Sequence, residues 1–218
     1  MNCIVTAGPT FEPLDDVRRL TNFSTGRLGT ELANFLTARG HKVTLLIGES
    51  ATYPGERRTQ SVKTFSTTAD LRAKLKAFSG KKVDAIFHAA AVSDFSFGKV
   101  FAQNAAGEFV ALKASGKIST RRGEMLAELV PTPKIITELR AWFPQTKIVG
   151  WKFEVAGRRT GALRAAEKQL AGCGTDFCVA NGPAYGQGFN LVSADGRKHF
   201  AGALKLFAAL EKIARGQF

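Results

Sequence analysis

CIVTAGPT, at residues 3–10, is a short apolar strand that runs directly into a glycine–proline turn. A polar loop follows and closes with STG at residues 24–26, and a helical pattern begins near Leu28. Backbone N–H groups at such a turn and at a helix N-terminus attract anions, and the helix dipole adds partial positive charge. The order of strand, turn, hydroxyls and helix therefore predicts a phosphate-binding loop, lined by Gly8, Ser24, Thr25 and Gly26.

Strand and helix patterns alternate along much of the remaining chain. Near-continuous apolar strands separated by helices are typical of a parallel sheet that is covered on both faces. We therefore predict one α/β domain over residues 1–218, with a doubly wound, Rossmann-like parallel sheet. The expected strands lie at 3–7, 42–47, 62–65, 83–90, 146–152 and 175–180, with a hairpin at 190–193 and 198–200; the expected helices lie at 28–39, 69–78, 132–142, 160–171 and 203–214.

Residues 95–125 depart from this alternation. Four glycines are spread among short alternating runs in this stretch, and no helical pattern interrupts it. We interpret it as an inserted flap or hairpin and not as a further strand–helix–strand unit.

Composition narrows the class of protein. The 218 residues contain 31 Lys and Arg against 18 Asp and Glu, a net charge of +13. Such a balance favours polyanionic partners such as phosphorylated metabolites or nucleic acid, or indicates only a basic surface. The basic residues are dispersed, so we do not expect dedicated nucleic-acid binding.

No apolar run approaches the ~18–20 residues of a membrane span, and no signal-peptide pattern is present. We expect a cytoplasmic protein that does not bind membranes.

The three cysteines are odd in number and few, which favours a reducing compartment. Cys3 and Cys178 lie in strand-like apolar runs, where we expect buried small hydrophobic side chains. Cys173 and Cys178 lie five residues apart with no other cysteine or compact histidine pair nearby, which does not favour a zinc site.

Polar and small residues follow several of the predicted strands. Because the carboxyl ends of parallel strands meet at one sheet edge, we expect these residues around one crevice. Asp94, after the buried strand at 83–90, is suited to bind a cation or a hydroxyl. His88, inside that strand, is expected in the core; Trp151 is equally compatible with core and site, and Lys117 alone reads as an exposed lysine. The other crevice residues are Lys152, Glu154 and Asn181.

Eight segments in order resemble the motifs of one enzyme family over nearly the whole chain. The most specific are TAGPTFEPLDDVR at 6–18 and TNFSTGRLG at 21–29. The others are AAAVSDF at 89–95, KI at 117–118, TPKI at 132–135, VGW at 149–151, AN at 180–181 and GF at 188–189. Together they resemble phosphopantothenoylcysteine synthetase, the ligase of coenzyme A biosynthesis.

The resemblance implies a two-step ligation that depends on Mg²⁺ and on ATP or CTP. The carboxylate of 4′-phosphopantothenate attacks the nucleotide, pyrophosphate leaves, and cysteine then displaces the nucleotide monophosphate to form an amide. It implies catalytic roles for Asn22 at the acyl carbon, Lys117 at the phosphoryl group and Arg18 at a charged substrate group, with Asp94 near the metal. The implied nucleotide-binding residues are Gly8, Ser24, Thr25, Gly26, Ala91, Asp94, Trp151, Lys152, Asn181 and Phe189.

The same resemblance implies a homodimer. Family members often carry Phe where this chain has Trp151, and Asp where it has Gly182. The chain starts at the ligase motif, so we expect no flavin and a separate decarboxylase that acts downstream. The sequence does not decide between ATP and CTP.

Two alternatives remain. An NAD(P)-dependent Rossmann-type reductase fits the sheet, but no GxGxxG follows the first strand and no Tyr-x-x-x-Lys pair is present. A basic nucleic-acid-binding protein fits the net charge of +13.

Overall fold

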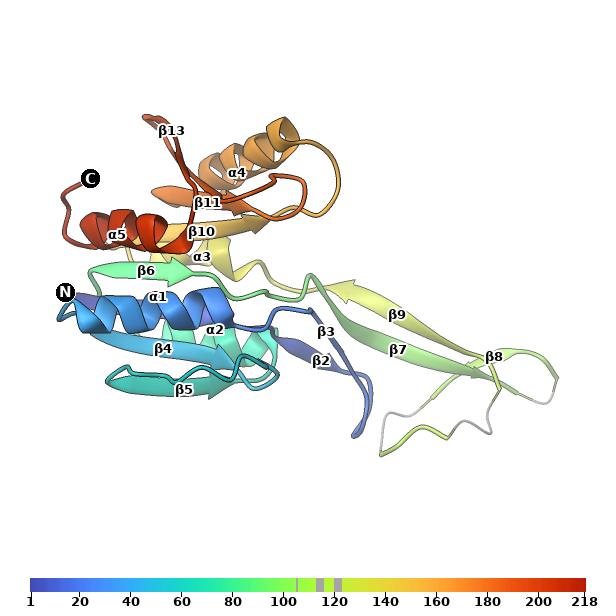
Figure 1. The fold of residues 1–218 in the computed structure, drawn as a ribbon. Helices are drawn as coiled ribbons and strands as arrows, with labels where there is room; N and C mark the ends of the chain where they lie inside the picture. The colour runs from blue at the N-terminus through green and yellow to red at the C-terminus, as the bar shows by residue number, and fades with distance from the viewer. Residues whose placement is uncertain (105, 113–115, 120–122) are drawn as a thin grey trace.

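The computed structural model describes residues 1–104, 106–112, 116–119 and 123–218. Within these residues, an eight-stranded sheet has the order β13-β12-β11-β10-β6-β1-β4-β5 (Figure 1). Six strands are parallel and two, β12 and β13, form an antiparallel hairpin at one edge. The bounds are β1 Asn2–Ala7, β4 Lys42–Gly48, β5 Ser61–Phe65, β6 Ala85–His88, β10 Lys147–Phe153, β11 Phe177–Asn181, β12 Phe189–Ser193 and β13 Gly196–Phe200.

The six parallel strands follow the order of a doubly wound sheet, so the predicted fold class is confirmed. Counted along the chain, β5-β4-β1-β6-β10-β11 is the order 3-2-1-4-5-6, which reverses between β1 and β6. Ligands of such sheets bind outside the carboxyl ends of the strands at this reversal. The topology therefore places any ligand site beside the ends of β1 and β6.

Helices cover both faces of the sheet, because successive strand residues point to opposite sides. In β1, Val5 belongs to a buried cluster with α1 (Arg27–Ala38) and α5 (Ala203–Ala214). Its neighbour Ile4 belongs to a cluster with α2 (Thr68–Lys76) and α3 (Ile135–Trp142). The helix α4 (Arg159–Cys173) packs beside α3 against β11 and β12.

The flap is a separate three-stranded antiparallel sheet, β8-β7-β9, which projects away from the main sheet (Figure 1). Its strands are β7 (Phe95–Gln103), β8 (Phe109–Ala111) and β9 (Met125–Pro131). The flap runs beyond the predicted end at residue 125, because β9 pairs with β7 as far as Pro131. The large apolar residues Leu126, Leu129 and Val130 of β9 are exposed.

A short hairpin that the sequence did not predict lies between the sheet and the flap. It pairs β2 (Phe11–Pro13) with β3 (Arg19–Thr21) inside the loop that follows β1. The element was missed because three-residue strands within a polar loop carry no alternating pattern. It brings the ends of the loop together, so residues 14–18 form its tip.

Two of the three cysteines lie in the hydrophobic core. Cys3 and Cys178 are buried, as predicted, and burial raises the pKa of each thiol to about 12. Among the described helices, none has the length and apolar character needed to cross a bilayer.

Candidate active site at the carboxyl ends of the strands

A cleft of about 940 Å³ lies at the carboxyl ends of β1, β6, β10 and β11. It gathers residues that the sequence predicts for the site, from segments as distant as the turn after β1 and the start of β12. Those that line it are Gly8, Asn22, Ser24, Thr25, Gly26, Ala91, Asp94, Trp151, Lys152, Asn181 and Phe189. The cleft lies where the strand order reverses, as the topology requires.

Backbone hydrogen bonds hold the ends of β1 and β6 together at the cleft. The N–H of Thr10 donates to the carbonyl of Ala91 at 3.1 Å, and the N–H of Ala91 donates to the carbonyl of Gly8 at 3.0 Å. Asn22 donates from its side-chain amide to the same Ala91 carbonyl at 3.1 Å. This bond places the amide of Asn22 just beyond the end of β6, where the strand order reverses.

The N-terminus of α1 opens onto the cleft. Its N-cap is Gly26, which adopts the left-handed conformation (φ 80°), and the first turn holds no acidic side chain. The N–H of Arg27 donates to Oγ1 of Thr25 at 3.3 Å. Gly26 itself supplies no side-chain cap, so the N–H groups of the next residues, Leu28 and Gly29, are available to an anion. Gly29 lets the helix approach closely: a Cβ there would lie 2.6 Å from Cβ of Ala7.

Two buried polar atoms at the other end of the cleft have no partner. Nε1 of Trp151 and Oδ1 of Asn181 are enclosed and accept or donate no hydrogen bond within the described residues. An unpaired buried donor or acceptor costs about 1–3 kcal/mol. One donor and one acceptor on the cleft wall are therefore available to a polar ligand group. Trp151 lines the cleft and also packs against the core.

Lys152 and Glu154 lie together near this end of the cleft. Their side chains form an ion pair at 3.2 Å between Nζ and Oε1. Lys152 lines the cleft, and its partner Glu154 also binds the loop after β11 through its backbone.

His88, predicted for the core, is buried and also reaches the cleft wall. Its Nδ1 lies 3.0 Å from Oγ1 of Thr6 in the adjacent strand. Burial lowers the pKa of the imidazole to about 4, so the side chain is neutral at physiological pH.

Arg18 and Lys117 do not line the cleft. Arg18 donates from Nη2 to the backbone carbonyl of Ile118 at 2.8 Å and to the carboxylate of Asp15. Asp15 in turn accepts from the N–H of Ile118 at 3.0 Å, and hydrogen bonding to Arg18 holds the pKa of Asp15 well below its usual range. Lys117 is exposed beside this contact.

Several cleft residues were not singled out from the sequence. Phe23, Phe153 and Val155 are exposed apolar side chains on the cleft wall, and Lys134 lies there at the N-cap of α3. Phe23 stands between the predicted Asn22 and Ser24, so its position in the motif was the signal that could have identified it.

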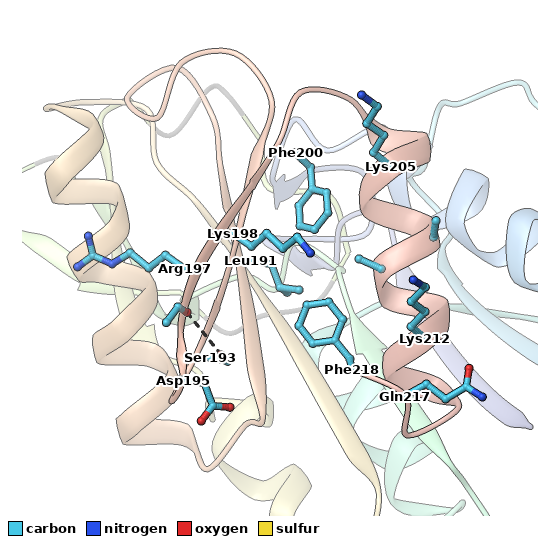
Figure 2. Close-up of a pocket in the computed structure, with 13 residues that line it drawn as sticks. Leu191, Ser193, Asp195, Arg197, Lys198, Phe200, Lys205, Lys212, Gln217 and Phe218 are labelled. Carbon is cyan, nitrogen blue, oxygen red and sulfur yellow. Dashed lines mark hydrogen bonds between the residues drawn. The ribbon is translucent and has the colours of Figure 1, made fainter.

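A second hollow of about 590 Å³ lies apart from the cleft, between the β12–β13 hairpin and α5 (Figure 2). Its floor includes Leu191, Phe200 and Phe218, and Nζ of Lys198 lies 5.8 Å and 5.6 Å from the two ring centroids. None of the predicted site residues lines it. The other basic residues around it are Arg197, Lys205 and Lys212, so part of the positive charge of the chain gathers here.

Comparison with known proteins identifies relatives of this chain. Residues 1–197 match the family model "DNA/pantothenate metabolism flavoprotein C-terminal domain". The coenzyme A biosynthesis bifunctional protein CoaBC of Thermococcus kodakarensis is 35% identical over 196 residues, covering 89% of this chain and 44% of that protein. The CoaBC protein of Bacillus subtilis is 30% identical over 204 residues, covering 89% and 45%. The chain thus spans less than half the length of these relatives.

Solved structures share the fold. A DNA/pantothenate metabolism flavoprotein from Streptococcus pneumoniae has a TM-score of 0.86 at 24% identity, covering 100% of both chains. A variant of Cab2 in complex with phosphopantothenate-cysteine has a TM-score of 0.75 at 18% identity, covering 99% of this chain and 87% of that one.

Proposed function

Because the chain belongs to the family of DNA/pantothenate metabolism flavoprotein C-terminal domains, we propose that it is the phosphopantothenate–cysteine ligase of coenzyme A biosynthesis. The observation that carries this proposal is the single cleft that joins the glycine turn, Asn22 and Asp94. The names of two relatives, both coenzyme A biosynthesis bifunctional proteins, support the proposal.

The nucleotide, ATP or CTP, occupies the cleft from the N-terminus of α1 to the end of β11. Gly8 and residues 24–26 surround the phosphates, which the open helix end and its dipole attract. The unpartnered Nε1 of Trp151 and Oδ1 of Asn181 are placed to meet polar groups of the nucleotide. Lys152, Ala91 and Phe189 complete this wall.

Asp94 is the proposed metal-binding residue. Its carboxylate is exposed on the cleft wall, and the described residues hold no group of three or more metal-ligating side chains. Such a site suits Mg²⁺, which is commonly held by one or two carboxylates together with substrate phosphates. When bound, the ion offsets negative charge on the phosphates.

The first step is activation of the acid. A carboxylate oxygen of 4′-phosphopantothenate attacks the α-phosphorus, the bond to the β-phosphate oxygen breaks, and pyrophosphate leaves. Lys117, which does not line the cleft in this structure, would have to approach the phosphoryl group to stabilise the charge that develops there. Its neighbour Ile118 is held by Asp15 and Arg18, so Arg18 acts here by positioning that segment and not by reaching the cleft.

The second step forms the amide. The amine of cysteine attacks the acyl carbon, loses a proton, and the nucleotide monophosphate leaves with the bonding electrons. Asn22, anchored to Ala91, presents an uncharged amide that would orient the acyl group or the amine. An uncharged group suits this task because the amine must remain deprotonated to react.

We further propose that two copies of the chain associate. The exposed apolar residues Leu126, Leu129 and Val130 of β9 offer a surface that a second copy would cover. We also propose a cytoplasmic location and a separate decarboxylase that consumes the product.

Cysteine-dependent release of pyrophosphate tests the function. Purified protein would be mixed with 4′-phosphopantothenate, cysteine, Mg²⁺ and either ATP or CTP. We expect pyrophosphate and the amide product in equal amounts with at least one nucleotide. Failure to form the amide with either nucleotide would reject the proposal, and the better nucleotide would settle the choice of base. Titration with NADH and NADPH tests the rival reductase, for which we expect no binding.

A further inference from the structure

The hydrogen bonds around Thr6 fix the proton of His88 on one ring nitrogen. Oγ1 of Thr6 accepts a hydrogen bond from the N–H of Ala90 at 3.0 Å and lies 3.0 Å from Nδ1 of His88. Thr6 is fully buried, and its hydroxyl has one hydrogen to donate. Within the described residues, Nδ1 of His88 is the acceptor in reach of that hydrogen. The hydroxyl therefore donates to Nδ1.

A neutral imidazole that accepts at Nδ1 carries its proton at Nε2. If Nδ1 instead carried the proton, the Thr6 hydroxyl would be left without an acceptor in a site that excludes water, which is unfavourable. Burial keeps His88 uncharged, so the side chain offers one donor, Nε2–H, at physiological pH.

This donor faces the cleft. His88 is the last residue of β6 and lines the cleft, where it remains 5% exposed. None of the described residues bonds its Nε2, and that atom is not among the enclosed atoms that lack a partner. The open side of the ring is thus turned to the space that a ligand fills.

The donor lies on the face of the sheet opposite the phosphate loop. His88 pairs in register with Thr6 and Gly150, so the three residues share one face. That face carries α3: a Cβ at Gly150 would lie 2.7 Å from Cδ1 of Ile136. The turn at Gly8 leads instead to the face covered by α1, because Ala7 belongs to the α1 cluster.

We propose that His88 binds the acid substrate, donating from Nε2–H to one of its oxygen atoms at the carboxyl end of β6. This inference rests on the proposed function and names a residue for the acid subsite, on the sheet face away from the phosphate loop. An uncharged donor orients a carboxylate or carbonyl oxygen without neutralising the nucleophile. Lys134, one of the basic residues that line the cleft, lies at the start of α3.

Nuclear magnetic resonance of the intact protein with ¹⁵N-labelled histidine tests the tautomer and the ligand contact together. The chain has three histidines, and His88→Gln identifies the resonance of His88. We expect a proton on Nε2 and none on Nδ1 at pH 7.5. Addition of 4′-phosphopantothenate alone should shift the Nε2–H resonance, whereas ATP or CTP alone should not. A proton on Nδ1, or a shift caused by nucleotide alone, would overturn the inference.

Two amide variants form a matched pair for kinetics. In His88→Gln the side-chain nitrogen reaches the place of Nε2 and keeps the donor, whereas in His88→Asn it reaches only the place of Nδ1. We expect His88→Asn to raise KM for the acid about tenfold, the effect of one hydrogen bond, with KM for the nucleotide unchanged and His88→Gln close to the parent.

Equal effects of the two variants on KM for the acid would show that His88 has only a structural role. The magnetic resonance experiment needs no turnover. If the protein binds the acid through Nε2–H and forms no amide, the proposed function fails while this inference stands.

Discussion

Asp15 and Arg18 hold the two backbone groups of Ile118 between them. The carboxylate accepts the N–H at 3.0 Å, the guanidinium donates to the carbonyl at 2.8 Å, and the two side chains bind each other. The tip of the hairpin after β1 is thereby joined to the segment that carries Lys117, a hundred residues later in the chain.

Replacement of Arg18 should impair turnover without weakening nucleotide binding. Arg18→Gln removes the charged donor to Asp15 and to Ile118, the residue next to Lys117, so the segment that carries Lys117 is held less firmly. Because the Arg18 side chain is partly exposed and acts only by holding this segment, we expect kcat to fall roughly tenfold. Nucleotide affinity, measured by calorimetry, should stay near the parent value. Arg19→Gln is the matched control, since the Arg19 guanidinium lies over the ring of Phe11 at 4.5 Å. A parental kcat in Arg18→Gln would remove this contact from the mechanism.

Asn22→Ala should separate the two chemical steps. The acid would still be activated, because the phosphate loop is intact, while amide formation would slow for lack of the amide that Ala91 anchors. Rapid-quench experiments should therefore show pyrophosphate release ahead of amide formation and an accumulating acyl-nucleotide. Gln145→Ala, which removes an exposed amide outside the cleft, serves as control. Unaltered amide formation in Asn22→Ala would count against its role.

Asp94→Asn should raise the Mg²⁺ concentration needed for half-maximal activity. The amide is a weaker ligand for a hard cation than the carboxylate that it replaces. Activity would be measured over a Mg²⁺ series at saturating nucleotide, with Asp195→Asn at the second hollow as control. An identical Mg²⁺ dependence in parent and Asp94→Asn would place the ion elsewhere.

Gly29→Ala should destabilise the protein, whereas Gly172→Ala should not. The added methyl group at Gly29 would lie 2.6 Å from Cβ of Ala7 and 3.0 Å from the carbonyl oxygen of Thr6, so α1 must move off β1. Overpacking of this kind costs about 1–3 kcal/mol. Gly172, in α4, has nothing within 4 Å, and alanine there should add about 0.5–1 kcal/mol. Urea denaturation of the three proteins measures the difference.

His88 should make the stability of the fold depend on pH. Its pKa of about 4 in the folded state lies below the ordinary value of 6.5, so between these values the unfolded chain binds more protons. The free energy of unfolding should therefore decrease as the pH falls from about 6.5 to 4, by up to ~3 kcal/mol from this residue. His88→Gln should flatten that part of the profile, measured by urea denaturation at several pH values. An equal slope in both proteins would assign the effect to other groups.

The sequence identified the parallel sheet and much of the cleft because periodicity and strand-end residues are local signals. Asn22, Asp94 and Asn181 follow strands or turns, so topology brings them to one edge. The sequence could not predict the partners of Arg18. A contact between residues 18 and 118 depends on how the flap folds, and no local pattern encodes it. His88 was placed in the core correctly, but only the contact with Thr6 reveals which nitrogen faces the cleft.

The reversal of strand order between β1 and β6 has a consequence for how the molecule folds. The cleft draws its walls from Gly8, directly after β1 at the start of the chain, and from β11 and β12 near its end. Pairings of such long sequence separation form late and slowly. No half of the chain possesses the cleft, so ligand binding appears only when the sheet is complete. A bound nucleotide then stabilises the whole fold by mass action, and the unfolding midpoint should rise with its concentration.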